Sequence, residues 1–384
     1  MIRIGENGSI SACESYLAQI AQDPAPLLLA ERLSYAAFGG SAALAQVMCT
    51  WARRSPDAEL FPQFDAHRTF HDLAMRPHGL TAILMARAIT GPHREDWRRA
   101  AYEAAARVSF AMDQSRFVET TKGNAVALLC ADHSSLGYLT PFYAQGPQGA
   151  VLRTEVEFQQ LASDVLRASV NQARADEVAR YAGDVGVMMR ELIDNTHRYA
   201  RRDARGNQYR KSIRGLHAQT HQVEPGDIPT LTGDYAPLAG YLQGITGRFR
   251  SKHTQVLEIS IFDSGPGLAA RALGTELQAE TPIGDEQRLV QSRFHDPKLR
   301  YGRDGAGKGL RRTVRRLKSD GGFLRLRTGR TSFYKDFHTA SDAPLEPADL
   351  QLLDAASATH VATEMAKAEG TLLTLLIPLF GGRR

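Results

Sequence analysis

The stretch Glu191-Leu192-Ile193-Asp194-Asn195 decides the fold and the site that we expect of this chain. The residues around it, from Glu155 to about Ala200, have the spacing of a long helix. Glu191 and Asn195 are four residues apart, so their side chains share one helix face, one turn apart. A carboxylate and an amide oxygen placed in this way can act on a water or hydroxyl and bind a hard cation such as Mg²⁺. By itself, however, the pattern more often marks an ordinary solvated helix face.

A second motif, Asp263-Ser264-Gly265-Pro266-Gly267, follows the apolar run Val256 to Phe262, which we expect to be a strand. An aspartate at a strand end accepts hydrogen bonds and can read the exocyclic amine of adenine. The glycines allow a tight turn and a close approach of the backbone to a ligand. Taken alone, this motif is more typical of a surface turn.

A third motif, Gly305-Ala306-Gly307-Lys308-Gly309-Leu310, precedes an arginine-rich segment from Arg311 to Leu317 that we expect to be helical. A glycine-rich loop that opens a helix presents free backbone N–H groups, which suit phosphate oxygens. The glycine spacing differs from that of a P-loop, and no Ser or Thr follows the lysine. The motif also lacks the strand–GxGxxG–helix arrangement of a dinucleotide fold.

In their order and spacing, the three motifs resemble the N, G1 and G2 boxes of the GHKL (gyrase, Hsp90, histidine kinase, MutL) ATPase superfamily. The resemblance covers roughly Glu155 to Phe380. Gly321-Gly322 before the expected strand Phe323 to Thr328, and Gly370-Thr371 opening the expected last strand, match further positions of the family. The resemblance implies a Bergerat fold, a two-layer α/β sandwich with a mixed sheet covered by helices on one face.

The resemblance also implies that the site binds ATP and Mg²⁺. Glu191 would be the general base that polarises the attacking water or hydroxyl, Asn195 would ligate Mg²⁺, and Asp263 would bind the adenine amine. Lys308 would contact a phosphate or point to solvent. The other residues expected at the nucleotide are Arg198, Gly265, Gly267, Gly305, Gly307, Gly309 and Thr371. The segment Leu268 to Asp304 would be a lid that orders on nucleotide.

The length of 384 residues suits two domains. The turn-forming cluster Gly146-Pro147-Gln148-Gly149 suggests a boundary, with an N-terminal α/β domain at 1–148 and the ATP-binding domain at 149–384. We expect the first domain to be regulatory or partner-binding and vaguely similar to STAS-like domains. Its expected elements are Pro26 to Ala30 (strand or helix start), helices at Gly40 to Arg54 and Arg94 to Asp113, and a buried strand at Asn124 to Ala131. The whole chain is therefore expected to be α/β (α+β).

Composition supports a soluble globular protein, with 43% hydrophobic and 23% charged residues. No apolar run approaches the roughly 20 residues that span a bilayer, and the N-terminus lacks the apolar core of a signal peptide. Cys13, Cys49 and Cys130 are scattered and suggest neither a disulfide framework nor a metal site. We therefore expect a cytoplasmic protein with no membrane partner.

Further expectations concern helices, histidines and the family's catalytic lysine. The long helical segment is expected to break at Gly183 or Gly186, and Glu346 to Glu369 to form an extra helix that serves as a partner or dimer surface. No histidine lies between Gln148 and Glu191, which disfavours autophosphorylation on histidine, and we expect His133 in a loop or in the core. Asp65, His67 and His71 are interpreted as polar surface and not as metal ligands. The catalytic lysine domain that follows the ATP domain in gyrase-like and MutL-like relatives is expected to be absent.

Two basic segments accompany a net charge of +5. Both are more typical of a solvated face than of an anionic partner such as nucleic acid, since no nucleic-acid-binding signature accompanies them. Their members are Arg198, Arg201, Arg202, Arg205, Arg210, Lys211 and Arg214 in the first, and Arg311, Arg312, Arg315, Arg316 and Lys318 in the second.

The sequence leaves three functions open. The first is an ATPase that acts as a nucleotide-driven conformational switch in a cytoplasmic signalling or defence system. The second is a serine/threonine protein kinase of the anti-sigma type that phosphorylates a partner protein. The third is a nucleotide-binding scaffold without catalysis, which the presence of Glu191 modestly disfavours.

Overall fold

The computed structural model describes residues 1–5, 7–30, 37–63, 69–134, 136–170, 175–249, 253–295, 308–339 and 341–379. Gly305 and Gly307 of the third motif lie outside the described residues, as do Asp65 and His67. The side chain of Lys308 is not described either.

A seven-stranded sheet forms the centre of the molecule, with its strands in the order β12-β11-β10-β13-β9-β8-β5. Every pairing among these strands is antiparallel, so the expectation of a mixed sheet is wrong. The expected strands before the second motif, after the third motif and at the chain end are confirmed as β9, β10 and β13. The strands are β5 (Ala125–Ala131), β8 (Ile213–Val223), β9 (Thr254–Asp263), β10 (Phe323–Gly329), β11 (Thr331–Asp336), β12 (Leu353–Asp354) and β13 (Ala368–Leu379).

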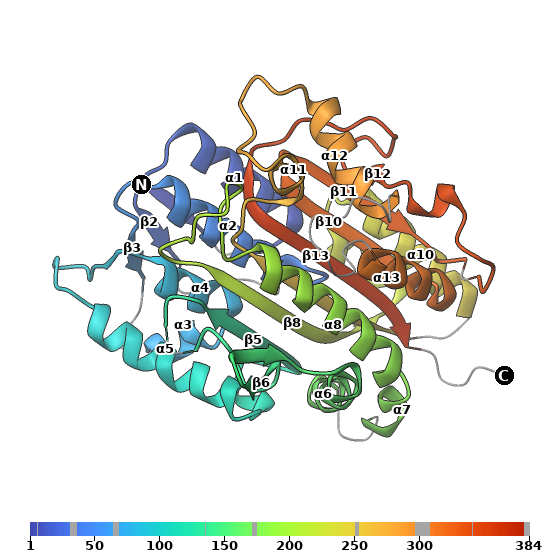
Figure 1. Ribbon diagram of the computed structural model, residues 1–384, viewed down its shortest axis with the longest axis horizontal. Helices are drawn as coiled ribbons and strands as arrows, with labels where there is room; N and C mark the ends of the chain where they lie inside the picture. The colour runs from blue at the N-terminus through green and yellow to red at the C-terminus, as the bar shows by residue number, and fades with distance from the viewer. Residues whose placement is uncertain are drawn as a thin grey trace.

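Helices α6 (Glu155–Ala168), α8 (Ala182–Tyr199) and α13 (Lys308–Asp320) pack together over one face of this sheet (Figure 1). The expected break at Gly183 or Gly186 is wrong, because α8 runs through both residues. The interruption comes earlier, where the short helix α7 (Ala175–Ala179) separates α6 from α8. Gly186 instead permits close helix packing, since a Cβ there would lie 2.5 Å from the Cα of Gln159.

Helix α2 (Gly40–Arg54), predicted at these bounds, is mostly buried and packs against β13, β9 and β8. It lies on the face opposite to α8. Successive residues of a strand point to opposite faces: Leu373 shares a cavity wall with Leu192 of α8. The next residue, Thr374, contacts the glycine that precedes α2, Gly39. Helices therefore cover both faces of the sheet, and the expectation of helices on one face only is wrong.

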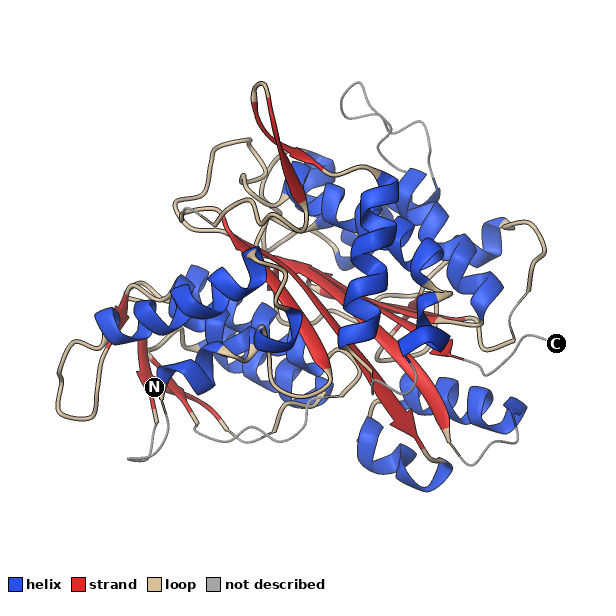
Figure 2. Cartoon of the chain, turned by 90° about the horizontal axis from the view of Figure 1, so that it is seen from below, coloured by secondary structure: helices blue, strands red, loops and turns tan. Residues whose placement is uncertain are grey.

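The N-terminal residues form a small parallel sheet with strand order β1-β2-β3-β4, which confirms an α/β arrangement there. Figure 2 shows it beside the N-terminus, apart from the large sheet. The expected helix from Arg94 begins at Arg98, and the run from Pro26 is a strand. The elements are β1 (Ile2–Ile4), α1 (Ile10–Gln22), β2 (Leu27–Leu29), β3 (Glu59–Pro62), α3 (Phe70–Ala74), α4 (Pro77–Met85), β4 (Ala88–Ile89) and α5 (Arg98–Asp113).

The chain before residue 148 also contributes to the large sheet. The buried strand expected at Asn124 to Ala131 is confirmed as β5, which pairs with β8 over its whole length. The glycine cluster at 146–149 forms the turn of a hairpin between β6 (Tyr143–Gly146) and β7 (Gly149–Leu152). The N-terminal and C-terminal parts therefore share one central sheet.

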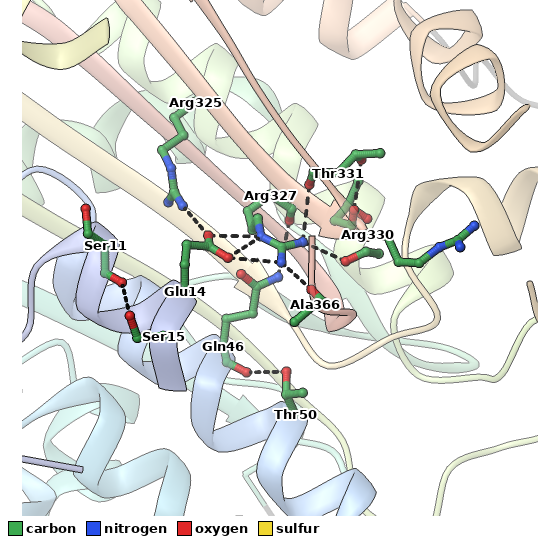
Figure 3. A network of polar contacts seen from close by, with 12 residues as sticks. Ser11, Glu14, Ser15, Gln46, Thr50, Arg325, Arg327, Arg330, Thr331 and Ala366 are labelled. Carbon is green, nitrogen blue, oxygen red and sulfur yellow. Dashed lines mark hydrogen bonds and ion pairs between the residues drawn. The ribbon is translucent and has the colours of Figure 1, made fainter. Parts of the chain in front are cut away.

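Helix α1 attaches to the large sheet through one carboxylate (Figure 3). Glu14 accepts hydrogen bonds from Arg325 at 3.2 Å and from Arg327 at 3.0 Å. Both arginine side chains are almost fully buried, at 2% and 1% exposure, so their charges depend on this carboxylate. Gln46 of α2 adds a hydrogen bond to the carbonyl of Arg327.

The helix expected at Glu346 to Glu369 is absent, and that prediction is wrong. A 3-10 turn at Pro347–Leu350 and the short strand β12 precede an irregular loop. Asp354 organises the loop, since its carboxylate accepts hydrogen bonds from the backbone N–H groups of Ser357 and Thr363. An aspartate that bonds nearby backbone in this way competes with helix formation.

The remaining helices are α9 (Ile228–Thr232), α10 (Ala236–Phe249), α11 (Leu268–Leu273) and α12 (Ile283–His295), with 3-10 turns at Phe117–Glu119 and Pro225–Asp227. None of the helices in the described ranges has the length and apolar character needed to cross a membrane.

Candidate functional site

A cavity of about 400 Å³ lies between α8, the ends of β9 and β13, and the start of α11. The first and second motifs both reach its wall, through Asn195 of α8 and through Asp263 and Gly267 after β9. Thr371 of β13 and Leu310 of α13 also line the cavity. Four of the expected site residues, from three separate segments, therefore surround one cavity.

Asp263 is the buried acidic group of this cavity, and its residue is 8% exposed. Burial raises the pKa of Asp263 to about 6, although its carboxylate accepts hydrogen bonds from the backbone N–H groups of Gly265 and Thr371. The distance from the nitrogen of Gly265 to Oδ1 is 2.8 Å. The carboxylate is thus held in place by backbone donors and titrates close to neutral pH.

Glycines fit the backbone around Asp263. Gly370 has a φ of +72°, and a Cβ there would lie 1.8 Å from the carbonyl oxygen of Asp263. Gly267 has a φ of +84°, and a Cβ there would lie 2.9 Å from the hydroxyl of Thr328. Side chains at either position would be strained as well as blocked. Gly265 packs on Ala200, with 2.8 Å from a built Cβ to its Cα.

Thr328 ties the second motif to the neighbouring strands. Its hydroxyl accepts the N–H of Leu268 at 3.0 Å and donates to the carbonyl of Gly370 at 3.1 Å. It also lies 3.4 Å from the hydroxyl of Thr371. The loop after β9 is therefore fixed to β10 and β13 at the cavity edge.

Glu191 lies beside the start of α13 and not among the residues that line the cavity. Its Oε1 is 2.6 Å from Nη1 of Arg312, whose Nη2 is 3.1 Å from Glu155. A Cβ built on Gly309 would lie 2.6 Å from Oε2 of Glu191. The first and third motifs therefore meet at this carboxylate.

Arg198, which is expected at the nucleotide, lies on α8 one turn after Asp194. It pairs with Asp194 on the same helix at 2.9 Å and does not line the cavity. An i,i+4 pair on an exposed helix face is a common surface feature.

Three arginines at the cavity were not predicted as site residues. Arg205, Arg271 and Arg293 line it, and Asp263 is the single acidic residue among the described lining residues. The guanidinium carbon of Arg271 lies 5.0 Å from the ring centre of Tyr199. Arg271 and Arg293 belong to the segment expected to be a lid. The arginine content of that segment was the feature of the sequence that could have indicated them as site residues. Three positive groups against one carboxylate suit an anionic ligand.

Few of the described side chains at the cavity could bind a metal ion. Within the described ranges no group of three or more His, Cys, Asp or Glu residues could hold a metal ion. Mg²⁺ differs from structural metals in this respect, since it commonly takes one or two protein oxygens together with phosphate oxygens and waters. Asn195 on the cavity wall supplies one such oxygen.

Many residues of the two basic segments have partners inside the molecule. Arg201 and Arg214 pair with Asp132, and Lys211 donates to the carbonyls of Leu84 and Ala86. On α13, three basic side chains pair with acidic ones, as Arg312–Glu191, Arg316–Asp184 and Lys318–Asp349. These ion pairs give the basic residues a structural role that needs no nucleic acid.

His133 lies in the turn after β5, and its Nε2 is 3.1 Å from the carbonyl oxygen of Leu84. This placement confirms the expectation of a loop or core histidine. His71, on α3, is a described residue, whereas its expected neighbours Asp65 and His67 are not.

Comparison of the chain with protein-family models, with curated proteins and with solved structures found no match.

Proposed function

We propose that this chain binds ATP and Mg²⁺ in the cavity beside α8 and acts as an ATPase of the GHKL type, switching conformation with its nucleotide. The observation that carries the proposal is the convergence of Asn195, Asp263, Gly267 and Thr371 on one cavity of about 400 Å³. Cavities of this size, with apolar walls and a few polar groups, are typical of small-molecule sites. The large sheet with α6, α8 and α13 would then be a Bergerat fold that departs from the family pattern in its antiparallel pairings and in the N-terminal part on its opposite face.

The polar groups of the cavity suit the two ends of a nucleotide. Asp263, held by backbone N–H groups, accepts a hydrogen bond from the adenine amine. Arg271 and Arg293 line the same cavity and suit the negative charge of the phosphates. Asn195 is the residue that would hold Mg²⁺, which when bound neutralises charge on the phosphate oxygens.

Glu191 is the group proposed to act on the attacking water. Its carboxylate accepts a proton as the water oxygen bonds to the γ-phosphorus and the bond from that phosphorus to the β,γ-bridging oxygen breaks. ADP and inorganic phosphate are the products, and the proton returns to solvent. A serine or threonine hydroxyl of a partner in place of water would make the same site a protein kinase.

The proposal is tested by calorimetry of ATP binding with and without Mg²⁺, with phosphate release followed in the same samples. We expect the wild type to bind, Asp263→Asn to weaken binding at least roughly tenfold, and Asn195→Ala to lose the dependence on Mg²⁺. Gly183→Ala, at a position of α8 where a built Cβ meets nothing within 4 Å, is the matched control on the same helix and should leave binding unchanged. A wild-type protein that binds no adenine nucleotide would falsify the proposal. Binding with phosphate release only in the presence of a partner would favour the kinase.

A further inference from the structure

The first turn of α13 surrounds the Glu191 carboxylate from two sides. Arg312 donates to Oε1 at 2.6 Å. The backbone of Gly309 lies against the other side, because a Cβ there would be 2.6 Å from Oε2 and 3.0 Å from the Cβ of Glu191. The Glu191 side chain is 18% exposed, so protein atoms cover most of it. Its carboxylate has one oxygen bound by the Arg312 guanidinium and the other facing Gly309.

Arg312 is itself held at its far end. Its second terminal nitrogen donates to Glu155 at 3.1 Å, so one guanidinium bridges α6 and α8. A guanidinium is planar, with a rigid fork of N–H donors, so two carboxylates fix its orientation better than one. An arginine fixed in this way restrains the carboxylate that it binds.

We propose that Arg312 is a positioning residue for Glu191, restraining the orientation of this carboxylate beside the first turn of α13, while the proposed function has the carboxylate accept the proton from the attacking water. The inference rests on the proposed function, because it assigns Arg312 a role only if Glu191 acts as the base. A glutamate side chain has three rotatable bonds, and a general base is effective only within hydrogen-bond reach of its proton. Misplacement of a reacting group by about 1 Å can cost roughly a hundredfold in rate.

One turn further along α13, Arg316 forms a comparable ion pair that touches no expected site residue. Its Nε is 3.0 Å from Asp184 of α8, and the two arginines have similar exposures, 47% and 44%. Both pairs connect α13 to α8. Arg316 therefore separates the effect of joining the two helices from the effect of holding Glu191.

The experiment compares wild type, Arg312→Gln, Arg312→Lys and Arg316→Gln in nucleotide affinity, steady-state phosphate release and urea unfolding. We expect Arg312→Gln to lower kcat roughly tenfold to a hundredfold while the Kd for Mg²⁺–ATP stays within about threefold. Arg312→Lys should recover part of kcat, since the ammonium reaches one carboxylate. Arg316→Gln removes one ion pair between α13 and α8, so it should lose some stability and keep the wild-type kcat.

The outcomes separate the inference from the proposed function. If the wild type binds no nucleotide, the proposed function fails. If the wild type binds and turns over ATP, an Arg312→Gln variant with unchanged or raised kcat overturns the positioning role. Equal losses of kcat in Arg312→Gln and Arg316→Gln also overturn it, because the effect is then one of helix packing. A wild type that binds Mg²⁺–ATP without any turnover contradicts it as well, because the proposal has Glu191 accept its proton from water.

Discussion

At the scale of the residue, Asp263 is an acidic side chain in a buried position, where its charged form is unfavourable. The residue is 8% exposed, and burial raises the pKa of its carboxyl to about 6 from an ordinary value of 3.8. An acid whose pKa is raised by folding binds more protons in the folded state than in the unfolded state between these two values. Folding stability therefore falls as the pH rises from about 4 to about 6. The protein retains a carboxylate that costs stability at neutral pH, which is a common property of binding sites.

This cost leads to a prediction for Asp263→Asn. An asparagine keeps one carbonyl oxygen to accept from the backbone N–H groups of Gly265 and Thr371 and carries no buried charge, so at pH 7.5 the nucleotide-free variant should be more stable than the wild type. The gain should be at most roughly 3 kcal/mol, from about two pKa units at 1.36 kcal/mol each, and should shrink towards zero near pH 4. Urea unfolding at both pH values measures it. A variant less stable than wild type at pH 7.5 contradicts the assigned burial cost.

A second residue-scale prediction concerns Gly370→Ala. The new Cβ would lie 1.8 Å from the backbone oxygen of Asp263, and the φ of +72° is unfavourable for alanine. Backbone must move to relieve both, so we expect a loss of stability on the order of 3 kcal/mol and weaker ATP binding. Thermal unfolding and calorimetry measure the two effects. Gly226→Ala, where a built Cβ meets nothing within 4 Å, is the control, and equal losses in both variants would argue against a steric cause.

At the scale of the element, α8 carries two glycines with opposite roles. Gly183 has open space around a built Cβ, whereas Gly186 has the backbone of Gln159 on α6 within 2.5 Å. The first glycine therefore only lowers helix propensity, and the second allows α6 and α8 to approach closely. Because α8 also carries Asn195 to the cavity wall, its position relative to α6 matters for the site.

Alanine at these two positions should change stability in opposite directions. Gly183→Ala should raise the free energy of unfolding by about 0.5–1 kcal/mol through helix propensity. Gly186→Ala should lower it by roughly 1–3 kcal/mol through overpacking, and should displace α8 enough to weaken ATP binding. Urea unfolding measures the stability of both variants. Each variant is the control for the other, since both changes add one methyl group to the same helix. If both variants are stabilised, the two helices are not packed as closely as the structure shows.

At the scale of the whole molecule, the N-terminal part and the large sheet are joined by polar as well as apolar contacts. Glu14 connects α1 to Arg325 and Arg327 of β10, as seen in Figure 3. Near the C-terminal end of α2, Arg53 donates to the carbonyl of Ser264 in the second motif at 3.1 Å. Helix α2, on the sheet face opposite to the cavity, therefore contacts the second motif, which carries Asp263.

Removal of the Glu14 charge tests this junction. Glu14→Gln leaves two nearly buried guanidinium groups without a carboxylate, so we expect a loss on the order of 3 kcal/mol. Because the N-terminal part shares its core with the large sheet, unfolding should remain one cooperative transition at a lower temperature. Calorimetric unfolding measures both features. Glu103→Gln, which removes a surface pair with Arg99, should cost at most about 0.5 kcal/mol. Two separate transitions in the Glu14 variant would show that the parts fold independently.

The sequence by itself determined the local elements and the candidates for chemistry. The periodicity of Gly40 to Arg54 predicted α2, and short apolar runs and the alternation of Phe323 to Thr328 predicted β5, β9, β13 and β10, because these patterns depend on near neighbours in the chain. Motif order was enough to select Asn195, Asp263, Gly267 and Thr371, which line one cavity. Helix spacing likewise placed Glu191 and Asn195 on one face of a helix.

Only the tertiary structure decided how these pieces combine. The antiparallel order of the sheet, the position of α2 on its second face and the pairing of Arg312 with Glu191 all depend on contacts between residues far apart in the chain. The missing helix after Glu346 has a local and a distant cause. Asp354 accepts hydrogen bonds from backbone groups three and nine residues ahead, and β12 pairs with the more distant strand β11. Local propensity is a weak preference, and distant contacts of this kind override it.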